Sequence, residues 1–209
     1  MEFITPIFKW IHIIAGVLWI GLLYFFNWIN GHVAATMDGD TKKKVVPELM
    51  PRALYFFRWG AAWTWVTGMV LLLLVYWMQM NDSMFRELGI GEEASKFKHV
   101  AYLIPFIMVF VYDAFYKSSL AKNTRVATIT SFMGIAGVLC LLICVSEMTS
   151  YRAYNIHLGT MFGSMMAFNV WYRIWPAQQR IITAIKNGDA PNPADAGMAG
   201  LRSKHNTYM

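Results

Sequence analysis

The chain has 209 residues, of which 57% are hydrophobic, 16% are aromatic and only 14% are charged. Soluble domains carry roughly 25% charged residues, so the composition argues against an ordinary cytosolic enzyme. The net charge of +6 is scattered over short polar segments between long apolar runs. A nucleic-acid binder would gather such a charge on one dense basic face, so we expect a membrane protein with no nucleic-acid partner.

Five stretches are long and apolar enough for transmembrane helices, which need about 20 residues to cross the hydrocarbon. In chain order they are Pro6–Ile29, Leu54–Met80, Phe97–Tyr116, Val126–Met148 and Ala153–Trp175. Pro176 is expected to stop or kink the fifth helix. The predicted fold is an all-α, polytopic membrane bundle of about five helices over residues 1–186, followed by a cytoplasmic tail over residues 187–209.

The orientation follows from the basic residues of the polar segments. Three segments that lie on one side of a five-helix chain carry Lys42, Lys43, Lys44 and Arg52, then Lys117, Lys122 and Arg125, then Arg180, Lys186, Arg202 and Lys204. Because basic loops stay in the cytoplasm, we expect the N-terminus outside and the C-terminus inside.

Three histidines fall near the starts of the first, third and fifth predicted helices, and these helices begin on the same side. His12, His99 and His157 are then all within roughly 10 Å of the outer surface, at 1.5 Å per residue. Two of the three could ligate a metal or a haem iron in the bundle core, because ionisable residues in membranes usually face the interior. The alternative is that each histidine is hydrogen-bonded at the membrane interface.

A second set of ionisable residues lies toward the inner ends of the helices. Asp113 on the third helix is level with Arg58 on the second and Arg173 on the fifth. A carboxylate at that depth needs a cationic partner, so we expect a structural ion pair between Asp113 and one of the two arginines.

Several segments resemble the transmembrane N-terminal domain of the bacterial membrane-bound urate oxidase (urate hydroxylase) family. The similar segments are, in order, Lys9–Asn27, Arg58–Gly68, Val111–Asp113, Ile156–Val170, Ile174–Gln178 and Arg202–Tyr208. The resemblance implies a helical domain of the bacterial inner membrane that oxidises urate to 5-hydroxyisourate. Full-length members carry a C-terminal cytochrome c domain, whereas this sequence has no CxxCH motif for a c-type haem. A distant similarity to small membrane protoporphyrinogen oxidases favours histidine-ligated haem b.

Two functions follow as hypotheses. The first is a membrane oxidoreductase of the urate-oxidase type, with haem b held by two of the three outer histidines and electrons passed toward a periplasmic cytochrome c. The second is a non-catalytic accessory subunit of a larger membrane electron-transfer complex. Solute transport has less support, because the sequence shows no paired broken helices and no intramembrane acidic pair.

Overall fold

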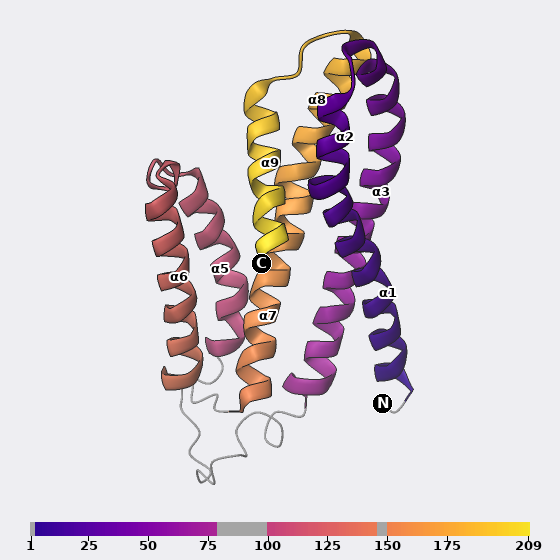
Figure 1. Cartoon of the computed structure of the whole chain (residues 1–209). Coiled ribbons are helices and arrows are strands. Elements are labelled where there is room, and N and C mark those ends of the chain that lie inside the picture. Colours follow the sequence, from indigo (N-terminus) through magenta and orange to yellow (C-terminus); the bar gives the residue numbers. More distant parts are fainter. Residues whose placement is uncertain (1–2, 79–99, 146–149) are drawn as a thin grey trace, which may run out of the picture. The chain divides into compact units, whose positions relative to one another are not determined.

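The computed structural model describes residues 3–78, 100–145 and 150–209, and all regular secondary structure in these residues is helical (Figure 1). The all-helical prediction is therefore confirmed for the described chain. The α-helices are α1 (Ile4–Tyr24), α2 (Gly31–Thr36), α3 (Gly39–Leu72), α5 (Val100–Lys117), α6 (Thr124–Cys140), α7 (Tyr151–Phe168), α8 (Trp175–Asn187) and α9 (Pro193–Tyr208). One short 3₁₀ helix, η4 (Leu120–Lys122), lies between α5 and α6.

The described residues contain π-helical segments that each continue an α-helix. They are η1 (Phe25–Asn30), η2 (Leu73–Trp77), η5 (Leu141–Val145) and η6 (Asn169–Ile174). Such wider turns are rare and often occur at functional positions. The helix does not stop at Pro176, because the helical backbone continues from the π-helical η6 into α8, whose first turn contains this proline. A kink at Pro176 stays a prediction.

Three helical stretches among the described residues are long and apolar enough to cross a membrane: Ile4–Thr36, Gly39–Trp77 and Thr124–Cys144. They correspond to the first, second and fourth predicted spans. The third and fifth predicted spans are helical as α5 and as α7 with η6. Polar residues such as Arg152, Asn155 and His157 lower the hydropathy of α7. Five crossings and their orientation therefore stay a prediction.

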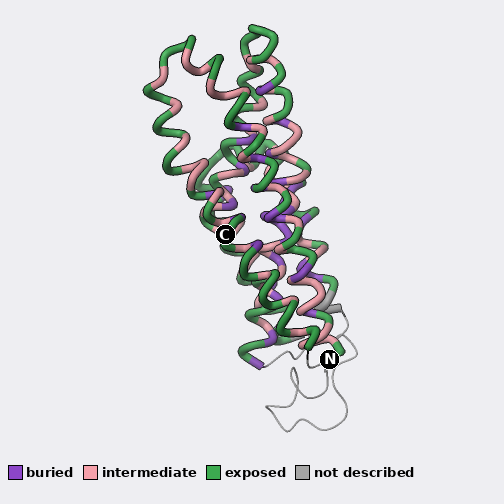
Figure 2. Tube along the Cα trace, turned by 90° about the vertical axis from the view of Figure 1, so that its right-hand side faces the viewer, coloured by how far each residue is buried: buried purple, intermediate pink, exposed green. Residues whose placement is uncertain are grey.

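The chain divides into two compact units, and the first comprises Met1–Gly68 with Met166–Met209. Helix α1 buries Ala15, Trp19 and Leu23 at intervals of four residues, which places all three on one face. Trp19 and Leu23 join a core that includes Phe57 from α3 and Val170 from η6. Most residues on the remaining faces of α1 are exposed and apolar, as a helix facing lipid would need (Figure 2).

Helix α9 packs along η6 and α8 within this first unit, beside α8 in Figure 1. Its Ala199, Arg202 and Asn206 are buried. Residues 193–208, which were expected to belong to a tail, are thus a packed helix of the first unit. Their location on the cytoplasmic side stays a prediction.

The second unit comprises Met69–Met165. Its buried residues include Val109 of α5, Val138 of α6, Leu142 of η5 and Met161 of α7. A hydrogen bond of 2.9 Å between the Tyr116 hydroxyl and Ser131 Oγ joins α5 to α6.

Candidate functional site

Close packing of α1 on α3 brings His12 to its position in the first unit. A Cβ built at Gly60 would lie 3.3 Å from the Cβ of Trp19, and one built at Gly68 would lie 3.1 Å from Cε1 of His12. Small residues on α3 therefore allow the two backbones to approach, as in many membrane helix pairs. The His12 ring occupies the space that a larger residue at position 68 would fill.

The hydrogen bonds of His12 determine which ring nitrogen carries the proton. Its Nδ1 is 2.9 Å from the carbonyl oxygen of Thr64 and 3.1 Å from Oγ1 of Thr67. A carbonyl oxygen can only accept, so Nδ1 donates and the neutral ring keeps its lone pair on Nε2. Within the described residues Nε2 of His12 has no hydrogen-bond partner. Histidines that ligate metals are usually oriented in this way by a carbonyl behind the ring.

His157 is buried in the second unit, and both of its ring nitrogens are engaged. Its Nδ1 donates to the carbonyl oxygen of Ala153 at 2.8 Å, and Nε2 accepts a hydrogen bond of 3.1 Å from Nε1 of Trp77. The imidazole and the indole are nearly parallel, at 26° and 6.5 Å between centroids. Trp77 is the last residue of η2, so the π-helical turn precedes the indole that covers His157. The indole would have to leave before Nε2 could bind a metal.

The predicted common depth of His12, His99 and His157 below the outer surface stays a prediction. His99 lies outside the described residues, and His12 and His157 belong to different units. In the described ranges no three His, Cys, Asp or Glu side chains gather to hold a metal ion. A haem iron needs only one or two side-chain ligands, so ligation by two of the predicted histidines stays a prediction.

His32 provides a useful comparison with the buried histidines. Its Nδ1 is bonded to the carbonyl oxygen of Trp28 at 2.9 Å, but the side chain is exposed. His32 and His157 therefore form the same hydrogen bond to the carbonyl four residues earlier in their helices. This bond is common within helices and does not by itself indicate a metal ligand.

Asp113 is buried in the second unit and forms an ion pair that the sequence analysis missed. Its Oδ2 is 2.9 Å from Nζ of Lys117, one turn further along α5. The spacing of four residues on one helix would have indicated this pair. The predicted pairing of Asp113 with Arg58 or Arg173 would join residues of different units, and it stays a prediction.

Both arginines contact aromatic rings within the first unit. The guanidinium carbon of Arg58 lies 4.0 Å from the ring centroid of Trp175 and 5.8 Å from that of Trp171. That of Arg173 lies 5.7 Å from the ring centroid of Phe168.

A buried polar cluster joins α9 to the rest of the first unit, and the sequence analysis did not anticipate it. Nδ2 of Asn169 donates to Oδ1 of Asn206 at 2.9 Å, and Nδ2 of Asn206 donates to the carbonyl oxygen of Met166 at 3.0 Å. Nδ2 of Asn27 donates to Oγ of Ser203 at 2.8 Å. Asn27 lies in η1 and Asn169 in η6, so π-helical turns present both amides to α9.

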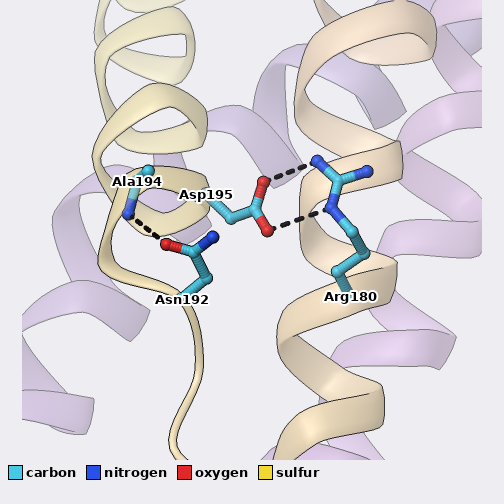
Figure 3. A network of polar contacts seen from close by, with 4 residues as sticks. All are labelled: Arg180, Asn192, Ala194 and Asp195. Atoms are coloured by element: carbon cyan, nitrogen blue, oxygen red, sulfur yellow. Dashed lines mark hydrogen bonds and ion pairs between the residues drawn. The ribbon is translucent and has the colours of Figure 1, made fainter.

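A helix cap and an ion pair stabilise the N-terminal turn of α9 (Figure 3). Oδ1 of Asn192 caps the helix by accepting from the backbone N–H of Ala194 at 2.9 Å. Arg180 of α8 donates to both carboxylate oxygens of Asp195, at 2.9 Å from Nε. These hydrogen bonds hold the pKa of the Asp195 carboxyl below its usual range and raise the pKa of Arg180.

In the part of the chain that the structure describes, the fold is all-helical, three helical stretches are long and apolar enough to cross a membrane, and each unit holds a histidine oriented by a backbone carbonyl. A family model described as urate oxidase N-terminal matches residues 39–209. The chain therefore belongs to the urate oxidase N-terminal family. The matched region contains Arg58, Asp113, His157 and Arg173, whereas His12 precedes it. No curated protein and no solved structure matches the chain.

Proposed function

We propose that this protein is a bacterial inner-membrane oxidoreductase of the urate-oxidase type that binds haem b through His12. The observation that carries the proposal is the fixed tautomer of His12, whose Nδ1 proton is bound by Thr64 and whose Nε2 lone pair has no partner among the described residues. Membership of the urate oxidase N-terminal family supports the choice of reaction.

The residues around His12 fit a histidine that would hold a haem iron. The carbonyl oxygen of Thr64 and Oγ1 of Thr67 orient the ring, and the carbonyl also makes Nε2 a better electron donor. The ring is half-buried, so its free nitrogen can be reached by a bound group. His157 would serve as the second ligand only if Trp77 released its Nε2. His99 is the other candidate for the second ligand, as the sequence analysis expects.

Oxidation of urate to 5-hydroxyisourate consumes water and releases two electrons and two protons. Haem would supply an iron that accepts electrons singly, and a cytochrome c on the outer side would receive them. The chain would contribute an oriented ligand, exclusion of water from the packed α1–α3 interface, and burial that tunes the haem. The site near the predicted outer end of α1 would keep the electron-transfer distance to a periplasmic acceptor short.

A reduced-minus-oxidised optical spectrum and a pyridine haemochrome assay of the detergent-purified protein test the proposal. We expect a b-type signal, its loss in His12→Ala and its retention in His32→Ala, the matched exposed histidine. If the wild type contains haem and oxidises urate with cytochrome c as acceptor, His12→Ala should lose this activity as well.

Two results would overturn the proposal. An unchanged haem spectrum in His12→Ala would exclude His12 as the ligand. A purified protein that binds no haem and turns over no urate would favour the accessory-subunit hypothesis, which predicts stoichiometric co-purification with other membrane subunits.

A further inference from the structure

Arg58 lies among aromatic side chains that come from two separate parts of the first unit. Its guanidinium carbon is 4.0 Å from the ring centroid of Trp175, 5.8 Å from that of Trp171 and 5.6 Å from that of Tyr55. The backbone carbonyl of Arg58 accepts a hydrogen bond of 3.0 Å from Nε1 of Trp171. Trp59 packs edge-on against Trp171 at 5.5 Å. Trp175, Trp171 and Tyr55 thus form an aromatic cage around the guanidinium of Arg58, and the Trp171 ring is held in place by two contacts.

The cage stabilises the charge of Arg58 but leaves its donors unused. Aromatic faces attract a cation, yet they do not replace the acceptor oxygens that five guanidinium N–H groups need. Nε of Arg58 is buried without a hydrogen-bond partner, and within the described chain Arg58 forms no ion pair. By contrast, Arg52 is paired with Glu48 and Arg180 with Asp195.

The position of Arg58 along α3 indicates what supplies the missing acceptor. The predicted second span begins at Leu54, so Arg58 lies about one turn, roughly 6 Å, inside it. Tyr55 and Trp59 are exposed at this level, and such rings are typical of the membrane–water interface. An arginine at this depth can extend toward the lipid headgroups while its stem stays among apolar groups. The anion most available there is a headgroup phosphate.

We propose that Arg58, with Trp175, Trp171 and Tyr55, binds the headgroup phosphate of an anionic phospholipid. The planar guanidinium can donate two parallel hydrogen bonds to phosphate oxygens, which a lysine could not match. An anionic lipid is preferred over a zwitterionic one because the headgroup then also carries the counter-charge of Arg58. The basic Lys42, Lys43 and Lys44 precede this site on the same helix and favour the same lipids.

Phosphatidylglycerol binding to the full-length protein, measured by native mass spectrometry from detergent and in phosphatidylcholine nanodiscs, tests the proposal. We expect Arg58→Gln to weaken binding about fivefold, the effect of one basic residue near an anionic surface. Arg58→Lys, which keeps the charge and is less disruptive to folding, should give an intermediate loss. Arg52→Gln is the matched control, because Arg52 is exposed two residues before the predicted span and its charge is already paired with Glu48. This variant should bind like the wild type.

Two results would overturn the proposal. The first is equal phosphatidylglycerol binding by the wild type, Arg58→Gln and Arg58→Lys. The second is loss of lipid in Asp113→Asn to the same extent as in Arg58→Gln, which would assign Arg58 to the predicted ion pair.

Discussion

Replacing Asn206 by alanine should loosen α9 from the first unit. Asn206 is buried, accepts a hydrogen bond from the amide of Asn169 and donates one to the carbonyl oxygen of Met166. Alanine removes both bonds and leaves the buried amide of Asn169 without this acceptor. Because Asn169 is fully buried, water cannot easily take the place of the lost acceptor, and the unpaired amide costs free energy.

The expected magnitude follows from the number and burial of these groups. A buried donor that loses its acceptor costs about 1–3 kcal/mol, and side-chain hydrogen bonds between membrane helices average about 0.6 kcal/mol each. We expect Asn206→Ala to lower the free energy of opening of α9 by about 1–3 kcal/mol. Because 1.4 kcal/mol corresponds to a factor of ten, the population of opened α9 should rise roughly 5- to 150-fold.

Hydrogen–deuterium exchange of the backbone amides of α9 measures this opening directly. Asn155→Ala is the matched control, because the Asn155 side chain is exposed and donates only to the carbonyl of Tyr151 in its own helix. It should leave the exchange of α9 unchanged. The double variant Asn169→Leu, Asn206→Leu should recover much of the protection, since replacing both partners by apolar groups leaves no donor unsatisfied. Exchange in Asn206→Ala within twofold of the wild type would refute the reasoning.

Two further predictions concern the α1–α3 contact and the α8–α9 ion pair. Gly68→Ala should displace the His12 ring by a few tenths of an ångström, seen as altered imidazole ¹⁵N shifts, whereas Gly134→Ala, which meets nothing within 4 Å, should leave them unchanged. Unaltered shifts in Gly68→Ala would contradict the close contact. Because the folded pKa of Asp195 is below its ordinary 3.8, its bond to Arg180 stabilises α9 above that pH and loses this effect as the pH falls toward the folded value. Arg180 stays charged over this whole range because its pKa is raised, so only Asp195 titrates. The difference in melting temperature between the wild type and Asp195→Asn should therefore be constant near neutral pH and disappear in acid, where Asp195 is protonated.

The apolar helices could be read from the sequence because hydropathy and helix length are local properties. Residues 6–29 and 126–148 were expected to be helical spans, and the structure has helices of suitable length and composition over 4–36 and 124–144. Inside a bilayer the backbone must satisfy its own hydrogen bonds, so a long apolar run has few alternatives to a helix. The pair of Asp113 with Lys117 was equally local, at four residues apart, and was open to prediction.

The burial of α9 could not be read in this way. Residues 187–209 are polar. Asn206 is buried and Ser203 is half-buried only because Asn169 and Asn27 face them from distant parts of the chain. The different states of the histidines have the same origin. The sequence by itself determined that His12 and His157 lie in helices. Only the tertiary structure decided that Nε2 of His157 accepts a hydrogen bond from Trp77 and that the carbonyl of Thr64 orients His12. A side chain's free donors and acceptors depend on partners across the fold, and no periodicity along a single helix encodes them.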